Sequence, residues 1–236
     1  MSSANGSKED LQPEVARAGT ETDLLGEMTE DQALAELQRA EIGAANIAAL
    51  AKSAVAAKSR KLGLAIVMHA RTPRHVSIPL LRRMFTFDVM QVTLTPAIAA
   101  DIKRAAEGQI VLRTESLPLG EKISLAKRAS GRVAAALLQA GEPQVIAPAL
   151  DNPHLTEALV AQALMRPEAP AALFQLTSEH RNWSNRREVQ IALLRSDKTP
   201  IGRMKELEKN FTEQFLREIV AESTRAKSTP ESPDSL

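Results

Sequence analysis

Residues 187–210 read REVQIALLRSDKTPIGRMKELEKN and contain two apolar patterns of helical spacing on either side of a short polar turn. Apolar side chains recur every three or four residues in both halves, which places each set on one face of a helix. In the turn, Thr199 is predicted to cap the second helix and Pro200 to occupy its first position, where a missing backbone N–H costs nothing. One such pair leaves its apolar faces in water. The stretch therefore predicts a stack of similar helical pairs.

The same succession of apolar helix, polar turn and proline recurs through the middle of the chain. Turns that contain Pro73, Pro96 and Pro118 follow one another at intervals of 22–23 residues. A fixed interval of this length is typical of helical repeats. No run of alternating polar and apolar residues is long enough to predict a strand. The sequence therefore predicts an all-α fold, and specifically an α-solenoid of short stacked helical repeats.

The composition along the chain divides it into five segments. Polar and acidic residues dominate the start, and the spacing of Thr29 and Gln32 predicts a capping box where helical order begins. The predicted segments are 1–28, a disordered acidic N-terminal segment; 29–59, a long N-terminal capping helix or helix pair; 60–211, the helical-repeat solenoid; 212–226, a C-terminal amphipathic helix; and 227–236, a disordered tail.

The residue types restrict both the kind of core and the kind of chemistry. The chain has 236 residues, of which 44% are hydrophobic, with one Trp and no Tyr. A core so poor in aromatic side chains favours closely packed helices. The chain has no Cys, which excludes disulfides, thiolate metal sites and a cysteine nucleophile. The longest apolar run, 62–70, is too short to span a membrane, and residues 1–10 lack the apolar stretch of a secretory signal. We therefore expect no membrane span and a cytoplasmic location.

The net charge of +1 conceals an uneven distribution along the chain. Residues 60–211 contain 22 Lys or Arg and 14 Asp or Glu, whereas the two flanking regions are acidic. This division has two interpretations. The middle region either presents a solvated basic surface between acidic flanks that aid solubility, or it contains an anion-binding surface that an acidic end of the same chain covers.

Two turns carry a resemblance to a known architecture. They are Ala149-Leu150-Asp151-Asn152-Pro153 and Leu193-Leu194-Arg195-Ser196-Asp197-Lys198-Thr199-Pro200. With their flanking helices they resemble the HEAT-like and leucine-rich-repeat-variant α-solenoids of bacteria, over residues 60–210. The resemblance implies an interaction scaffold. The iron–sulfur module of one type of variant-repeat protein is not implied, because this chain has no Cys. HEAT-like alkylpurine DNA glycosylases resemble this chain in size and in their basic middle region. Those enzymes use aromatic side chains and an acid in a basic groove, whereas this chain has only one Trp and no Tyr.

The densest polar cluster, residues 179–187, comes directly before the opening stretch. Its arginines beside Trp183 would bind a phosphate or stack on a base, with a helix that begins at Ser184 adding a favourable dipole. The alternative is that Trp183 fills a joint between two repeats while the arginines lie in water. The candidate binding residues are Arg181, Trp183, Arg186, Arg187, Lys198 and Arg203. A second basic set would extend this surface if the repeats stack in register: Arg71, Arg74, Arg82, Arg83, Lys127, Arg128 and Arg132.

The sequence contains no pattern of catalytic or metal-binding residues. His69 and His75 are six residues apart, which is not the spacing that places two ligands on one helix face. No nucleophile elbow or phosphate-binding loop is present. We therefore predict no catalytic residue, no metal and no cofactor. The leading hypothesis is a non-enzymatic scaffold that binds a protein partner through its repeat surface. The alternative is a nucleic-acid-binding or DNA-base-repair protein with a HEAT-like basic groove.

Overall fold

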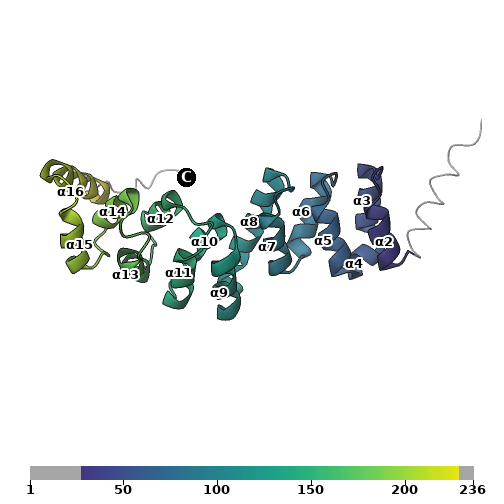
Figure 1. Cartoon of the computed structure of the whole chain (residues 1–236), viewed down its shortest axis with the longest axis horizontal. Coiled ribbons are helices and arrows are strands. Elements are labelled where there is room, and N and C mark those ends of the chain that lie inside the picture. Colours follow the sequence, from purple (N-terminus) through teal and green to yellow (C-terminus); the bar gives the residue numbers. More distant parts are fainter. Residues whose placement is uncertain (1–27, 229–236) are drawn as a thin grey trace, which may run out of the picture. The chain divides into compact units, whose positions relative to one another are not determined.

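The computed structural model describes the backbone of residues 28–228 and the side chains of residues 28–219 and 221 (Figure 1). Every regular element in this range is helical, which confirms the prediction of an all-α fold. The predictions for residues 1–27 and 229–236 lie outside the described residues. The elements are α2 (Glu30–Leu37), α3 (Ala44–Lys52), α4 (Ala54–Lys58), α5 (Arg60–Met68), α6 (Arg74–Arg83), α7 (Thr86–Leu94), α8 (Ala100–Arg113), the 3-10 turn η1 (Thr114–Ser116), α9 (Leu119–Arg128), α10 (Gly131–Leu137), α11 (Pro143–Leu150), α12 (Glu157–Leu164), α13 (Ala171–Glu179), α14 (Arg187–Leu194), α15 (Ile201–Glu208) and α16 (Glu213–Ser228).

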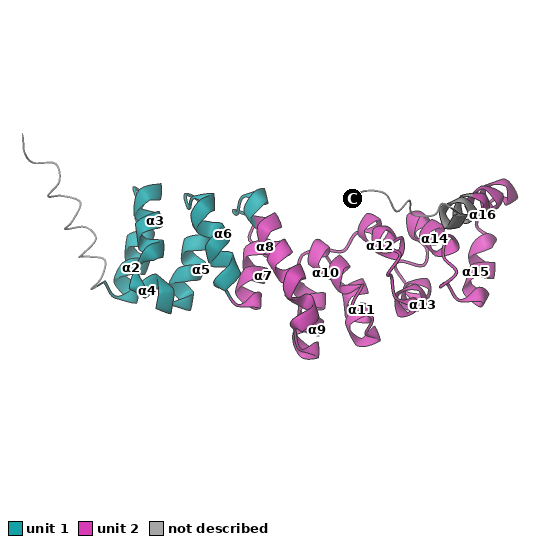
Figure 2. Cartoon of the chain, turned by 180° about the vertical axis from the view of Figure 1, so that it is seen from behind, with its two compact units in different colours: residues 1–84, 97–102 teal, residues 85–96, 103–236 magenta. Residues whose placement is uncertain are grey.

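The described residues fall into two compact units, which Figure 2 shows in different colours. Unit 1 contains residues 28–84 and 97–102, and unit 2 contains residues 85–96 and the chain from 103 onward. Each unit has its own packing arrangement.

Unit 1 begins with three short helices in the segment for which one capping helix or a helix pair was expected. The capping box at Thr29 is present, with the backbone N–H of Thr29 donating to Gln32 Oε1 at 2.9 Å. Gly43 is the N-cap of α3. Ser53 ends α3 and caps α4, because its hydroxyl donates to the Leu50 carbonyl at 2.7 Å and accepts from the next turn. Local capping therefore divides the apolar pattern into separate helices.

Helix α5 lies at the centre of unit 1, and α2, α3, α4 and α6 all pack against it. Its buried face presents Leu62 and Ile66, both of which are completely inaccessible to solvent. The rest of this core consists of small and aliphatic side chains, as expected for closely packed helices: Ala33, Leu37, Ile42, Ile47, Leu50, Ala56 and Val76.

Unit 2 packs helices that are two apart in the sequence. Helix α9 contacts α11 and α11 contacts α13, while α10 contacts α12 and α12 contacts α14. Consecutive helices also pack, as α9 does with α10 and α13 with α14. In Figure 1 the odd-numbered helices of this region lie along one side and the even-numbered helices along the other. From α9 to α14, each helical pair thus packs against the neighbouring pair.

The turn at the centre of residues 187–210 differs from the prediction in its capping. Pro200 is the N-cap of α15 and Ile201 its first residue, so the prediction that Thr199 caps this helix is wrong. The hydroxyl of Thr199 instead donates to the carbonyl of Leu193 at 2.6 Å. It satisfies one of the carbonyl groups that the end of α14 leaves without an intrahelical partner.

The same turn chemistry occurs in unit 1. The hydroxyl of Thr72 donates to the carbonyl six residues earlier, at 2.5 Å, as that of Thr199 does. The residue before each threonine is basic and reaches carbonyls 29 and 31 residues earlier: Arg71 binds those of Ile42 and Ala40. Lys198 does the same with Ala169 and Pro167, at 2.6 and 3.1 Å. Two turns that are far apart in the chain therefore use one set of hydrogen bonds to fasten one helical pair to the preceding pair.

A third joint, in unit 2, is built around the buried side chain of Asn152. Its amide donates to the carbonyls of Ala126 and Ala129 at the end of α9, at 2.7 and 3.1 Å. Its own carbonyl accepts the backbone N–H of His154 at 2.8 Å. This turn also lies against Gly131, where an added Cβ would overlap the His154 carbonyl. The Asn-Pro turn thus contacts the preceding pair through both its side chain and its backbone.

Candidate interaction surface

Trp183 fills the joint between α11 and the turn that follows α13. Its indole N–H donates to the carbonyl of Leu150 at 2.7 Å, and only 9% of the residue is exposed. Next to it, His180 Nε2 lies 3.1 Å from Asp151 Oδ1. Little of the indole surface is available for stacking on a base in this arrangement. The geometry matches the alternative in which the indole serves packing between repeats.

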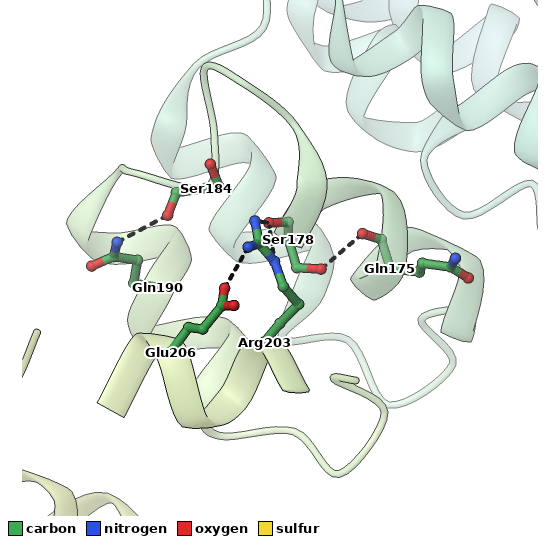
Figure 3. Close-up of polar contacts among 6 residues, drawn as sticks. All are labelled: Gln175, Ser178, Ser184, Gln190, Arg203 and Glu206. Atoms are coloured by element: carbon green, nitrogen blue, oxygen red, sulfur yellow. Dashed lines mark hydrogen bonds and ion pairs between the residues drawn. The ribbon is translucent and has the colours of Figure 1, made fainter. Parts of the chain in front are cut away.

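Three other candidate residues also make contacts within the chain. The guanidinium of Arg187 lies over two aromatic rings of the C-terminal region, 5.4 Å from the centroid of Phe211 and 5.8 Å from that of Phe215. Lys198 binds the backbone carbonyls described above. Arg203 Nε donates to the carbonyl of Ser178 at 3.1 Å, and its Nη1 pairs with Glu206 (Figure 3). These cations therefore have structural partners.

The start of α14 differs from the prediction that Ser184 caps it. The N-cap is Arg186, and no side chain caps the helix there. Ser184 is held instead by Gln190, whose amide donates to the Ser184 carbonyl at 2.9 Å (Figure 3). The backbone N–H of Glu188 donates to Glu157 Oε1 at 2.9 Å. A carboxylate of α12 thus already occupies a position at the helix N-terminus that the sequence analysis assigned to a ligand.

Arg181 and Arg186 are the two candidate residues whose guanidinium groups have no hydrogen bond or ion pair with the described part of the chain. Both line a hollow of about 620 Å³ beside the Asp151 turn. Two exposed asparagines, Asn182 and Asn185, complete its polar wall. The structure therefore brings together part of the predicted cluster as an exposed polar surface.

A second hollow lies on α8, α10 and α12 and contains residues that the sequence analysis did not select. We call it the arginine groove. Its volume is about 790 Å³, and residues from all three helices line it. Its lining residues are Arg104, Glu107, Gly108, Val111, Leu112, Arg132, Ala135, Ala136, Leu159, Gln162, Ala163 and Arg166. All of them belong to unit 2.

The arginine groove combines apolar and basic side chains. Leu112 is 78% exposed, and Val111 beside it is also exposed, although both are aliphatic. The groove contains three arginines and one carboxylate, that of Glu107. Glu107 accepts from Ser130 Oγ at 2.7 Å and lies 3.9 Å from Arg132. The surface is therefore basic overall, with an exposed aliphatic patch within it.

Arg166 lies where three hollows meet. It lines the arginine groove, a hollow of about 510 Å³ that includes Lys122, and one of about 250 Å³ that includes the exposed side chain of Met165. Its ion pair with Glu168 is long, at 3.8 Å, and both side chains are more than half exposed. A guanidinium at this junction can contact a ligand in any of the three hollows.

From the sequence, Arg132 was identified only as part of a broad basic set, and Arg104, Leu112 and Arg166 were not identified as binding residues. Arg104, Arg132 and Arg166 are separated by 28 and 34 positions in the sequence, and they line one groove only in the folded chain, where α10 packs against α12. One feature of the sequence pointed to an exposed apolar residue at this surface: Leu112 is a large apolar residue next to the charged residue Arg113 at the end of α8.

Neither a metal-binding cluster nor a membrane span occurs within the described residues 28–228. No group of three or more His, Asp or Glu in this range is placed to hold a metal ion. In the same range, none of the helices combines the length and the apolar character that a membrane span requires.

Comparison with protein-family models, with curated protein sequences and with solved structures yields no significant match to this chain.

Proposed function

We propose that this chain is a non-enzymatic scaffold, an α-solenoid of HEAT-like repeats that binds a protein partner through its arginine groove. The packing of alternate helices in unit 2 supports the repeat architecture. The shared hydrogen bonds of the Arg71 and Lys198 turns support it further, because repeats of common design place equivalent contacts at equivalent positions. The proposal places the protein in the cytoplasm, a location that rests on the sequence alone.

The observation that carries the proposal is the exposure of Leu112 and Val111 within a groove shared by three helices. An isolated exposed leucine is ordinary on a protein surface. Here the aliphatic side chains lie in a concave surface bordered by arginines, which is a composition favoured at protein interfaces. A partner that covers this patch would remove apolar surface from water.

The experiment compares partner capture by the parent chain with capture by Leu112→Asp. Captured proteins are identified by cross-linking and mass spectrometry, and the binding of each is then measured with purified components. Ile201→Asp is the matched control, because Ile201 is 74% exposed but does not line the groove. We expect Leu112→Asp to weaken a partner that Ile201→Asp still binds. Equal binding by the two variants would contradict the proposal.

A second candidate function, nucleic-acid binding, rests on the guanidinium groups of Arg181 and Arg186, which share one polar hollow and have no partner among the described residues. Backbone phosphates bind such groups with strong dependence on salt. A gel-shift titration with duplex and single-stranded DNA tests this candidate. Salt-sensitive binding that Arg181→Ala/Arg186→Ala abolishes, and that the exposed control Arg39→Ala retains, would support it. Absence of binding at micromolar protein concentration would eliminate it.

A further inference from the structure

We infer that the ligand of the arginine groove is an acidic amphipathic helix of a partner protein, with leucine-like side chains on one face and carboxylates beside them. This inference rests on the proposed function and specifies the chemistry of the partner. It follows from three properties of the groove: the form of its walls, its exposed aliphatic patch and the state of its arginines.

The helical walls of the groove favour a ligand whose backbone N–H and C=O groups are already hydrogen-bonded within the ligand. Helices α8, α10 and α12 supply all the lining residues except Arg166, and the backbone groups within a helix bond to one another. Arg166 follows the end of α12, and its backbone groups bond to Ala163 and Ala169. The groove therefore has no strand edge to which an extended peptide could add main-chain hydrogen bonds. A helical ligand needs no such edge, since its backbone is already paired and only its side chains contact the groove.

The aliphatic patch defines one face of this ligand. Val111 and Leu112 are exposed at the C-terminal end of α8, and Ala135 and Ala136 of α10 line the same groove. Because alanine side chains are small, Ala135 and Ala136 leave space in the groove for side chains of a ligand. The volume of about 790 Å³ holds several side chains but not a whole helix with its side chains. A helix would lie across the groove and insert leucine-like side chains from consecutive turns, as helices do in other apolar grooves.

The arginines define the charge of the ligand. The pairs Arg132–Glu107 and Arg166–Glu168 are 3.9 and 3.8 Å long, and both arginine side chains are more than half exposed. Exposed pairs of this kind contribute little to stability, so the arginines can transfer to a ligand carboxylate at small cost. A guanidinium also binds a carboxylate with two parallel hydrogen bonds, which gives directional recognition. Aspartate or glutamate beside the leucines would meet these requirements.

The first test measures the binding of synthetic peptides to the full chain by fluorescence anisotropy. The main probe repeats Glu-Glu-Leu-Leu over about 16 residues, a length sufficient for helix formation when packed, and is used below the concentration at which it self-associates. One control peptide has every Glu replaced by Gln, and another has every Leu replaced by Ser. We expect the Glu/Leu peptide to bind more tightly than both. If either control binds as tightly as the Glu/Leu peptide, the inference is overturned.

The second test places the peptide in the groove. We expect Arg166→Glu to weaken binding of the Glu/Leu peptide by about tenfold, since it replaces attraction by repulsion. The same variant should bind a Lys/Leu peptide more tightly than the parent does. Arg39→Glu, at an exposed position in unit 1 that lies outside both basic sets, is the matched control and should leave both affinities unchanged. Leu112→Asp should also lose binding of the Glu/Leu peptide. If Leu112→Asp and Arg166→Glu both bind this peptide with the affinity of the parent chain, the inference is overturned.

The third test separates the inference from the proposed function. A partner that depends on Leu112 should be displaced from the chain by the Glu/Leu peptide. A Leu112-dependent partner that the peptide fails to displace would leave the scaffold function standing and overturn the acidic helix. DNA binding that requires Arg166 but not Leu112 would overturn it as well, since a phosphate backbone uses the arginines without the aliphatic patch.

Discussion

The indole N–H of Trp183 donates to the backbone carbonyl of Leu150 at 2.7 Å, where α11 ends. This bond fastens the turn after α13 to the preceding helical pair. Side chains of Asn152, Lys198 and Arg203 make the same kind of contact, from a side chain to the backbone carbonyls of an earlier pair. Joints of this kind fix the position of one helical pair on the next, in addition to the apolar packing between them.

Removal of the indole N–H should weaken the Leu150 joint. We expect Trp183→Phe to lower the free energy of unfolding by about 1–3 kcal/mol, because the Leu150 carbonyl loses its donor and the smaller phenyl ring fills less of the buried joint. Urea titration followed by circular dichroism measures the change. In the parent chain, whose sole tryptophan is Trp183, emission should be blue-shifted when folded and move to longer wavelength on unfolding. Emission typical of an exposed indole in the folded chain would contradict the buried joint.

The Asn152 joint should be more sensitive, because one side chain satisfies three backbone groups. Asn152→Ala removes the donors to Ala126 and Ala129 and the acceptor of the His154 N–H. We expect a loss of about 3 kcal/mol in the free energy of unfolding, measured by the same titration. Asn185→Ala, in an exposed turn, is the control and should change stability by less than about 0.5 kcal/mol. Similar effects of the two substitutions would argue against the joint.

The sequence predicted the helical class well because apolar spacing is a local property. The patterns around Leu62 and Leu193 each lie on one helix, and both leucines are buried. The capping at Thr29 was predicted for the same reason, since donor and acceptor are three residues apart. The role of Thr199 was not predicted, because its hydroxyl had two local partners to choose from. It could cap α15 or donate to the end of α14, and the sequence does not decide between them.

The candidate surface was less predictable because its residues come together only through packing. Arg181, Arg186 and Trp183 are close in the sequence, so they were visible as a cluster, but the indole has an internal partner. Arg132 and Arg166 are 34 residues apart and line one groove, since α10 and α12 pack together. A local pattern cannot show which of many exposed arginines share a groove. That information depends on the register of the stacked helices.

The close approach at Gly131 gives a prediction with an internal control. An alanine Cβ there would overlap the His154 carbonyl and lie 2.9 Å from its carbon, so the backbone must shift. We expect Gly131→Ala to destabilise the fold by about 1–3 kcal/mol. Gly108→Ala, within α8 and with open space around the added methyl group, should instead stabilise by about 0.5–1 kcal/mol. Thermal denaturation of both variants measures whether the stability changes have opposite signs. If both variants are more stable than the parent, Gly131 does not lie against the His154 carbonyl.

The buried face of α14 is tested by a charge. Leu193 is completely inaccessible to solvent, so Leu193→Asp should cost on the order of 3–5 kcal/mol for an unpaired charge in a dry joint. Ile201→Asp, at the exposed start of α15, should change stability by less than about 0.5 kcal/mol. The comparison uses urea titrations of both variants. A Leu193→Asp variant that unfolds at the same urea concentration as the parent would show that this face is not buried.

The turns at Thr72 and Thr199 share the same pattern of hydrogen bonds, so replacing the threonine should have related effects in both units. Thr199→Val keeps the shape of the buried side chain but removes the donor to the Leu193 carbonyl, which should cost about 1–2 kcal/mol. Thr72→Val removes the equivalent bond to Ile66 in unit 1, and its cost should be smaller because Thr72 is only half-buried and water can replace the hydroxyl. Thr199→Ser and Thr72→Ser keep the donor and serve as controls. Hydrogen exchange resolved along the chain should show faster exchange near the end of α14 in the first variant and near the end of α5 in the second. If each serine variant loses as much protection as its valine counterpart, the hydroxyl is not what holds these turns, and the shared hydrogen bonds would no longer support a common repeat.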